Sequence, residues 1–374
     1  MNNGINIESC LHKLINLMLA IVLSTSMNVI ASSCPDIATL GAVSNNSAFA
    51  KFNTVTINSA LSTYSCVTIP KGIFWVSVSA GGIIVSSGNT IKGVNSESSM
   101  LVAADRSPGS IISRKIPIAR DDYVQGVRIH DIGVVLNHGT YHTQNPVMIG
   151  IDFSHITGSH ISNVYVGNAP EGIAKLAIPT PPKSDQTQGI GIKLCTYNSG
   201  LGTLYSGGER NIIEKTKIWG AKIGISIDDQ TCNQSAAHAT IIRDSDIQTV
   251  EYGIAQQSNA TAGVTLSGNT IQDFVSAGGN PETMMCAYYI KGYSINIQGG
   301  YIEGRSTNPL FALYLGDNAH GVKADLGYVS LNVPDSNHPG TPTPLVQMIR
   351  MAGYRNLITG YDMFSSGNWI NLSN

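Results

Sequence analysis

Lys217, Asp246 and Glu303 are the residues of this sequence best suited to acid–base chemistry on a sugar. They flank the same apolar position in three copies of a short repeated segment, so a regular fold would bring them onto one face. Two carboxyl groups can serve as general acid and general base at a glycosidic bond. A nearby lysine can neutralise a uronate or act as the base in β-elimination. We therefore predict a catalytic role for all three.

The same positions in other copies carry aromatic residues, whose rings can stack on the faces of sugars. The flanking pairs read Tyr165/Gly167, Lys217/Trp219, Asp246/Gln248, Thr270/Gln272, Tyr301/Glu303 and Tyr328/Ser330. The predicted substrate-binding residues are Trp219, Tyr165, Tyr301, Tyr328 and Arg305. With copies stacked about 4.8 Å apart, Asp246 and Glu303 would lie roughly 10 Å apart, near the upper end of the range for inverting hydrolysis.

Asp228 and Asp229 form a competing catalytic centre at the end of the segment Gly-Ile-Ser-Ile-Asp-Asp. Lys193 stands at the matching place after the preceding Gly-Ile dipeptide, which predicts that it lies beside Asp228. No cofactor or metal site is predicted, because neither the spacing of a calcium loop nor a His/Cys zinc spacing occurs. Calcium held by Asp228, Asp229 and Asp246 is the one alternative to this metal-free reading.

These candidate residues depend on a repeat in which an apolar residue, four mostly polar residues and a second apolar residue recur. The copies are Ile129–Val134, Ile161–Val166, Ile213–Ile218, Ile242–Ile247, Leu266–Ile271, Ile297–Ile302, Ala324–Val329 and Ile358–Met363. They start roughly 30 residues apart, with one longer interval before Ile213. A strand opening with Gly-Ile follows several copies, at Gly150-Ile151, Gly189-Ile190, Gly224-Ile225 and Gly253-Ile254. Such short runs cannot bury their own apolar faces and must stack.

The predicted fold is all-β: a single-stranded, right-handed parallel β-helix with a short N-terminal capping helix. The second apolar residue of each copy is expected to point inward, and its two neighbours outward. Asp131, Asn163 and Asp244 share one place in the repeat and are predicted to form turns. The segments 137–146, 177–188 and 331–344 contain proline and are predicted to be loops beside a binding groove.

The N-terminal region is divided into two segments before the solenoid. Residues 1–33 are predicted to be a signal peptide, because the apolar run 14–30 follows Lys13 and precedes small residues. Residues 34–64 are the predicted cap, with Phe49, Phe52 and Val55, and with Ala60 as a further candidate, on the apolar side of a short helix. Residues 65–374 are the predicted β-helix domain. The protein is expected to be secreted, extracellular or periplasmic, without a membrane association once the signal is removed.

Export permits disulfides among the cysteines that remain after removal of the signal peptide. A Cys34–Cys66 bridge would join the N-terminal segment to the first turns of the solenoid. Cys195 and Cys232 each follow a Gly-Ile strand in neighbouring repeats and form a second possible pair. Cys286 would then be left over as a buried thiol.

The composition restricts the partners of the protein. Charged residues make up 12% of the chain, the net charge is −2, and no Lys/Arg run occurs. Nucleic acid is therefore not an expected partner. Many small polar residues suit hydrogen bonds to a polysaccharide, and they equally suit the tight turns of a solenoid. The oligomeric state, monomer or trimer, stays open.

The order of the first strands carries a family resemblance. The segments "VTIPKGIFWV" and "GNTIKGV" precede the Ile-x-Asp/Asn-x-x-Ile repeats, and this order resembles the pectate-lyase-like superfamily of right-handed parallel β-helix proteins. That superfamily includes polysaccharide lyases and hydrolases and phage tailspike depolymerases, so the resemblance implies a carbohydrate polymer as substrate. The usual Asp-Asp-Thr-rich start is replaced by Ser44-Asn45-Asn46-Ser47. The companion motifs of the polygalacturonase branch are absent, so its mechanism is not transferred.

Three functions are consistent with the sequence. The first is a secreted polysaccharide lyase or glycoside hydrolase, and we favour it as the leading hypothesis. The second is a non-catalytic glycan-binding or surface-adhesion β-helix protein, and the third a polysaccharide epimerase. Convergence of Lys217, Asp246 and Glu303 in a groove would favour an enzyme, and a flat polar face would favour the binding protein.

Overall fold

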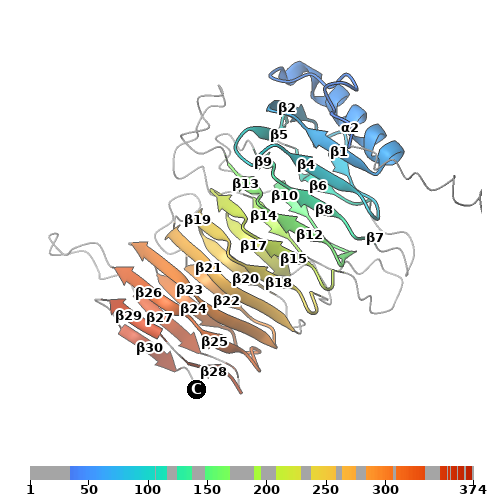
Figure 1. Ribbon diagram of the computed structural model, residues 1–374. Coiled ribbons are helices and arrows are strands. Elements are labelled where there is room, and N and C mark those ends of the chain that lie inside the picture. Colours follow the sequence, from blue (N-terminus) through green and yellow to red (C-terminus); the bar gives the residue numbers. More distant parts are fainter. Residues whose placement is uncertain are drawn as a thin grey trace, which may run out of the picture.

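The described part of the chain is a solenoid of parallel strands with one helix at its N-terminal end (Figure 1). The computed structural model describes residues 34–105, 107–115, 124–136, 148–168, 189–194, 208–228, 237–257, 263–274, 284–305, 309–332, 346–351, 353, 355–359, 361–365 and 368–372. The strand pairings of these residues are parallel, and each strand pairs with one from the next turn of the chain. The predicted parallel β-helix is confirmed.

Three ladders of strands run along the solenoid, and we call one turn of the chain a rung. The first ladder contains β1 (Cys66–Ile69), β4 (Thr90–Gly93), β8 (Arg128–His130), β12 (His160–Ser162), β15 (Ile212–Glu214), β18 (Ile241–Arg243), the start of β21 (Val264–Phe274), the start of β23 (Ile295–Arg305), β25 (Lys323–Asp325) and β28 (Leu357–Ile358). The second contains β2 (Gly72–Val76), β5 (Ser99–Ala103), β9 (Gly133–Val135), β13 (Tyr165–Gly167), β16 (Lys217–Trp219), β19 (Asp246–Val250), the ends of β21 and β23, β26 (Gly327–Asn332) and β29 (Tyr361–Ser365).

The third ladder is a separate ten-stranded sheet formed by the strands that follow each repeat. It contains β3 (Ile83–Ile84), β6 (Gly109–Ser113), β10 (Met148–Asp152), β14 (Ile190–Lys193), β17 (Ile223–Asp228), β20 (Tyr252–Gln256), β22 (Met285–Ile290), β24 (Leu310–Leu315), β27 (Val346–Met351) and β30 (Asn368–Leu372). A short pair, β7 (Val124–Gln125) and β11 (Ile156–Thr157), lies apart from it. The six-residue repeat thus forms the first two ladders, and the Gly-Ile segments form the third.

The second apolar residue of each repeat points inward, as predicted. Ile218, Ile247, Ile271 and Ile302 are fully buried and lie in register on successive rungs. Each such burial stabilises the fold by about 1.5–3 kcal/mol. The inward ladder therefore sets which residues of the second ladder can face solvent.

The bend between the first two ladders is made by residues with left-handed backbone. Asp131, Asn163 and Asp244 have φ values of 59°, 51° and 50°, which confirms that they form turns. Asn163 Nδ2 also donates to Asp131 Oδ1 at 2.5 Å, so the turns of adjacent rungs are joined. Asn and Asp tolerate this conformation better than most residues, which explains their recurrence at this place.

Glycine precedes isoleucine in the third ladder because a side chain would not fit there. A Cβ on Gly224 would lie 2.6 Å from the Gly253 carbonyl oxygen and 2.6 Å from Ile247 Cγ2. A Cβ on Gly191 would lie 2.6 Å from the Gly224 carbonyl oxygen and 2.9 Å from Ile218 Cγ2. These glycines let the third ladder approach the inward isoleucines of the second.

One register prediction is wrong in this ladder. The strand of β14 was expected to align through Gly189-Ile190, but Ile190 pairs with Ile223 and Ile192 pairs with Ile225. Gly191-Ile192 is therefore the equivalent dipeptide, and Lys193 pairs with Ser226 rather than with Asp228. The sequence offers two Gly-Ile dipeptides two residues apart, and only the close approach at Gly191 distinguishes them.

The cap is a helix, α2 (Ala50–Tyr64), preceded by the short 3-10 turn η1 (Ser47–Phe49). Its buried side differs from the predicted one except at Ala60: Phe49, Phe52 and Val55 are exposed, whereas the residues facing the first rungs are Ala50, Asn53, Thr54, Ile57, Ala60 and Leu61. Asn53 bonds the backbone of Val43 on both its N–H and its carbonyl and also donates to the Trp75 carbonyl. The buried side-chain amide of Asn53 therefore fixes both the segment before the helix and the strand β2 after it.

The cysteines of the described residues behave as expected. Cys34 and Cys66 form a disulfide with a Cα–Cα distance of 5.1 Å, which joins the N-terminal segment to β1. Cys286 is a buried free thiol. Cys195 and Cys232 lie outside the described residues, as do residues 1–33 and most of the three predicted loops.

Candidate functional site

Outward side chains of the second ladder form two parallel columns. The Asp246 column reads Tyr165, Lys217, Asp246, Thr270, Tyr301 and Tyr328, and the Glu303 column reads Gly167, Trp219, Gln248, Gln272, Glu303 and Ser330. Backbone pairing places each member beside the next, so Lys217 and Asp246 occupy adjacent rungs. The sequence predicted this alignment because these residues flank the inward isoleucines.

Asp246 and Glu303 are farther apart than rung spacing alone suggests. Asp246 is in line with Tyr301, whereas Glu303 is in line with Gln248. The two acids therefore differ by two rungs and also by two residues along the strand. Combining both offsets gives about 12 Å between their backbones, in place of the expected 10 Å. Only side chains that lean toward each other could act on one bond.

Asp246 has one satisfied and one unsatisfied carboxylate oxygen. Gln248 Nε2 donates to Asp246 Oδ2 at 2.7 Å, and the two side chains lie on the same face of β19. The other oxygen, Oδ1, is buried and has no hydrogen-bond partner. Lys217, one rung away, is exposed, and none of the ion pairs of the described residues includes it. A buried unpaired acceptor is costly, so Asp246 would gain from a donor, and Oδ1 can meet one from outside only if the side chain turns outward.

Glu303 is exposed and is held by the tyrosine two residues before it. Tyr301 Oη donates to Glu303 Oε2 at 2.5 Å. This hydrogen bond raises the pKa of Tyr301 to about 12, because loss of the phenolic proton would place two negative charges together. The bond draws the Glu303 carboxylate toward the Asp246 column.

The aromatic side chains of the C-terminal rungs form a stack. The rings of Tyr301 and Tyr328 are 5.0 Å apart between centroids and within 6° of parallel. One face of Tyr301 is turned to Tyr328, so its other face is turned toward the rung of Thr270. Thr270 is small, and the next member of the column is Asp246. Between Asp246 and Tyr301 the column therefore carries only the small Thr270 side chain, over two rung spacings or about 10 Å. We call this low part of the column the step.

On the N-terminal rungs of the same face, apolar side chains pack together and exclude solvent. This packing shows that the role predicted for Tyr165 is wrong. Tyr165 is 2% exposed, and its hydroxyl donates to the Asn168 carbonyl. It belongs to a cluster with Ile73, Met100, Val102 and Val135, against which Trp75 and Trp219 pack. Burial raises the pKa of Tyr165. Tyr165 is therefore not available for stacking on a ligand, and Trp219 marks the border of this cluster.

The rival centre is less well defined than the Asp246 column. Asp228 ends β17 as a strand residue whose side chain is outside the described set, and Asp229 is outside it altogether. Lys193 is buried and pairs with Asp152 on one side and with Ser226 on the other. The expected Lys193–Asp228 adjacency is thus wrong by two residues. The side chain of Arg305, predicted to bind substrate, also lies outside the described set.

A charged network on the first ladder was missed by sequence reasoning. Glu214 accepts from Arg243 at 2.8 Å through Oε2 and contacts His160 Nε2 at 3.0 Å through Oε1. The Arg243 guanidinium, with a smaller contribution from His160, lowers the pKa of Glu214. The signal was present, since these residues flank the first apolar residue of each repeat. The flanks of the first apolar residue align across rungs in the same way as those of the second, which form the Asp246 and Glu303 columns.

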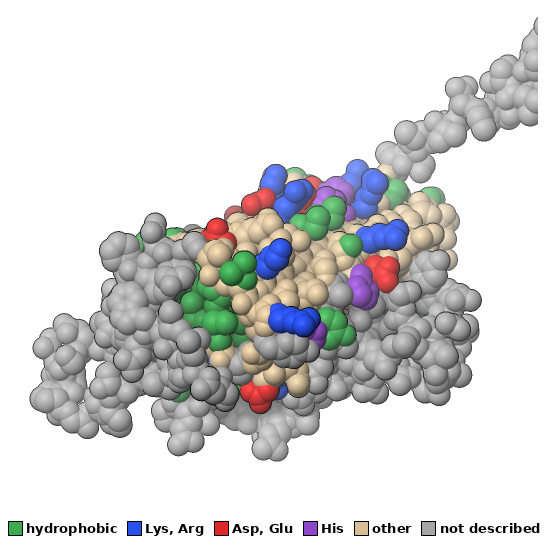
Figure 2. Space-filling view, turned by 90° about the horizontal axis from the view of Figure 1, so that it is seen from below, with side chains coloured by type: hydrophobic (Ala, Val, Ile, Leu, Met, Phe, Trp, Pro, Cys, Tyr) green, Lys and Arg blue, Asp and Glu red, His purple; other side chains and the backbone are tan. Residues whose placement is uncertain are grey.

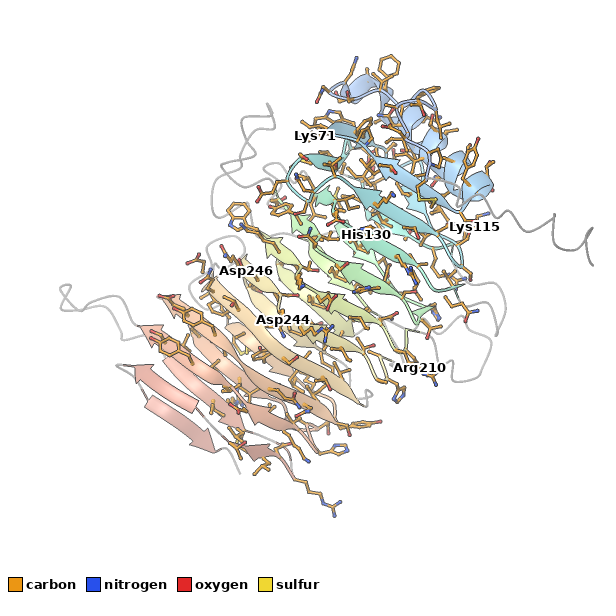
Figure 3. The ribbon with its side chains drawn as sticks, in the orientation of Figure 1. Lys71, Lys115, His130, Arg210, Asp244 and Asp246 are labelled. Carbon is orange, nitrogen blue, oxygen red and sulfur yellow. A yellow bond between two sulfur atoms is a disulfide. The ribbon has the colours of Figure 1, made fainter. Side chains whose placement is uncertain are left out.

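Seen from below, the surface of the described residues is mostly backbone and side chains that are neither hydrophobic nor charged, and several charged side chains gather along one edge (Figure 2). Asp244 lies on the front of the solenoid, whereas Asp246 lies toward its left edge (Figure 3). Within the described residues no group of three His, Cys, Asp or Glu side chains is placed to hold a metal ion. In the same part of the chain, no helix is long and apolar enough to cross a membrane.

Comparison with models of protein families and with curated proteins found no match. Among solved structures, pre-mature bacteriophage phi29 gene product 12 matches with a TM-score of 0.50 at 14% identity, covering 92% of this chain and 47% of that protein. The Streptococcus pneumoniae surface adhesin PfbA matches at 0.47 and 10% identity, covering 91% and 100%. The A-module of the Azotobacter vinelandii mannuronan C-5 epimerase AlgE6 matches at 0.45 and 11%, covering 90% and 97%. The likeness is one of fold.

Proposed function

We propose that this protein binds an extended polysaccharide on the outer face of the second ladder, between Asp246 and Tyr328. The observation that carries the proposal is the Tyr301–Tyr328 stack beside the small Thr270. The free face of Tyr301 is available to the apolar face of a sugar ring. The step over Thr270 leaves room for that ring.

Polar groups around the step suit the hydroxyls of a sugar. Gln272 neighbours Thr270 on the same strand, and Asp246 has a buried oxygen, Oδ1, that receives no hydrogen bond from the described residues. If the Asp246 side chain turns outward, a sugar hydroxyl can donate to that oxygen and satisfy it, which favours the bound state. Lys217, exposed beyond Asp246, could pair with a carboxylate of the next sugar unit. The site thus combines stacking, hydrogen bonding and one positive charge along a line.

Cleavage of the bound glycan is the second candidate function, and the orphaned Asp246 oxygen favours it. Once turned outward, a carboxylate oxygen without a donor can accept a proton from water or from a sugar hydroxyl. In this proposal one of Asp246 and Glu303 acts as general acid and the other as base, and Lys217 steadies an anionic group of the substrate. The diagonal placement of the two acids favours binding over cleavage, because with backbones about 12 Å apart both side chains must lean toward each other before their carboxyl groups reach the usual separation in inverting hydrolases.

The disulfide supports a location outside the cytoplasm. Cys34–Cys66 is formed within the described chain, and such bonds persist in oxidising compartments. We therefore place the protein outside the cell or in the periplasm, where polysaccharides are available as partners.

The decisive experiment is a panel of neutral and acidic polysaccharides measured for both binding and turnover. Binding is read by affinity electrophoresis, and cleavage by unsaturated uronate absorbance and by reducing ends. Tyr301→Ala should weaken binding about tenfold, whereas Gln298→Ala, on the exposed first ladder, should leave it unchanged. Equal binding by Tyr301→Ala and the unaltered protein would place the site elsewhere.

A further inference from the structure

A second aromatic surface lies on the outer face of the third ladder, near its C-terminal end. It consists of Tyr252, Tyr289, Phe311 and Tyr314, and we call it the third-ladder patch. Tyr289 and Tyr314 pair in register and stack with centroids 4.9 Å apart. Tyr252 meets Tyr289 edge-on at 5.4 Å, and Phe311 meets Tyr314 edge-on at 5.7 Å.

Two cations lie over the rings of this patch. Lys291 Nζ is 5.5 Å from the centroid of Tyr289, and Arg350 Cζ is 4.9 Å from that of Tyr314. None of the ion pairs among the described residues includes either cation. Glu251 is the acid beside Tyr252, but it is 3% exposed and lies 4.0 Å from Lys222. Within the described residues, therefore, no salt bridge neutralises the charges of Lys291 and Arg350.

The patch is accessible, which distinguishes it from the cluster around Tyr165. Tyr252, Tyr289 and Tyr314 are half-buried, as are Lys291 and Arg350, whereas Phe311 is buried beneath Tyr314 as its edge-on neighbour. The outward column containing Tyr289, Tyr314 and Arg350 continues from Ala255, which is fully buried in an apolar cluster against which Tyr252 and Tyr289 pack, so the accessible surface begins at these two tyrosines. From β20 to β27 this surface spans three rung spacings, or about 14 Å. Its length exceeds one sugar ring.

We propose that the third-ladder patch is a separate binding site for an acidic polysaccharide. The tyrosine rings would contact the apolar faces of the sugars, and the two cations would pair with carboxylate or sulfate groups. Charge complementarity selects an anionic chain over a neutral one. The patch lies on a different ladder from Tyr301, so this site is independent of the function proposed above.

The test uses two acidic polymers, each with a neutral counterpart: polygalacturonate with its methyl ester, and dextran sulfate with dextran. The variant Lys291→Gln/Arg350→Gln keeps both side-chain stems and removes both charges. We expect the unaltered protein to prefer at least one acidic polymer, and the double variant to bind that polymer about tenfold more weakly. Lys323→Gln, an exposed lysine on the first ladder, is the matched control and should bind normally.

Three results would overturn the proposal. The first is no preference for either acidic polymer over its neutral counterpart. The second is unchanged acidic binding by Lys291→Gln/Arg350→Gln with an unaltered unfolding temperature. The third is equal competition by poly-glutamate, which would identify an acidic polypeptide as the ligand. Tyr301→Ala separates the two sites, because it should weaken the second-ladder interaction and leave the charge-dependent binding at the third-ladder patch intact.

Discussion

Tyr301 donates a hydrogen bond from its hydroxyl to Glu303 Oε2 over 2.5 Å, on one face of a single strand. Residues two apart in a strand share a face, so β23 alone fixes this pair. The tyrosine also stacks on Tyr328 of the next rung. One side chain thus orients a carboxylate and closes one end of the proposed sugar site.

This pairing should be visible in a spectroscopic titration. The carboxylate of Glu303 raises the pKa of Tyr301 to about 12, so the phenol stays protonated above the usual value of 10.0. Glu303→Gln removes the negative charge and should lower that pKa. We expect tyrosinate absorbance for one residue to appear at lower pH in Glu303→Gln than in the unaltered protein. Identical titration curves would show that the hydrogen bond does not form in solution.

The two acids can be tested for catalysis without loss of the fold. Asp246→Asn and Glu303→Gln should each abolish turnover on any polymer that the protein cleaves, while glycan binding falls by less than tenfold. Thermal unfolding should change little for Glu303→Gln, whose side chain is exposed. Asn at position 246 can still accept from Gln248. Full turnover by both variants would exclude these residues and make Asp228→Asn the next test.

The inward ladder should control folding, and the outward column should not. Ile247→Asp places an unpaired charge in the fully buried stack and should cost more than about 4 kcal/mol, enough to prevent folding. Gln248→Ala, the next residue, should cost less than about 1 kcal/mol. Soluble expression and circular dichroism distinguish the two. Equal folding of both variants would contradict the observed facing of β19.

The glycine of the third ladder should not accept even a methyl group. Gly224→Ala forces a Cβ within 2.6 Å of a carbonyl oxygen and of Ile247 Cγ2, so we expect a loss of about 3 kcal/mol of unfolding free energy. Gly88→Ala is the control, since nothing lies within 4 Å and only its φ of 76° is unfavourable. That control should lose about 1 kcal/mol. The measurement is denaturant unfolding, and a smaller loss for Gly224→Ala than for Gly88→Ala would contradict the explanation.

The network of Glu214, Arg243 and His160 on the first ladder should stabilise the protein at pH values above the pKa of Glu214. Arg243 lowers the pKa of Glu214 from 4.5, so its contribution is present above about pH 4.5 and is lost as the pH falls through the lowered value. Arg243→Gln should therefore reduce the unfolding free energy at pH 7 by about 1 kcal/mol or less. At a pH below the lowered pKa the difference should vanish. A difference that persists at acidic pH would mean that Arg243 acts through packing instead.

The sequence by itself determined the solenoid and the facing of the second ladder. Apolar residues recurring with polar neighbours leave one way to stack, so Ile218, Ile247 and Ile271 had to align. Lys217 and Asp246 then became neighbours by position alone. The left-handed turns at Asp131 and Asp244 followed from the same periodicity.

Tertiary structure alone decided contacts that join unrelated positions. Tyr165 is buried because Met100 and Val135, from earlier rungs, surround an outward residue. Gly191 rather than Gly189 aligns with Gly224 because only there does the third ladder approach an inward isoleucine. Strand periodicity tells which face a side chain takes. It does not tell what covers that face, because the covering atoms come from other rungs, whose separation along the sequence varies.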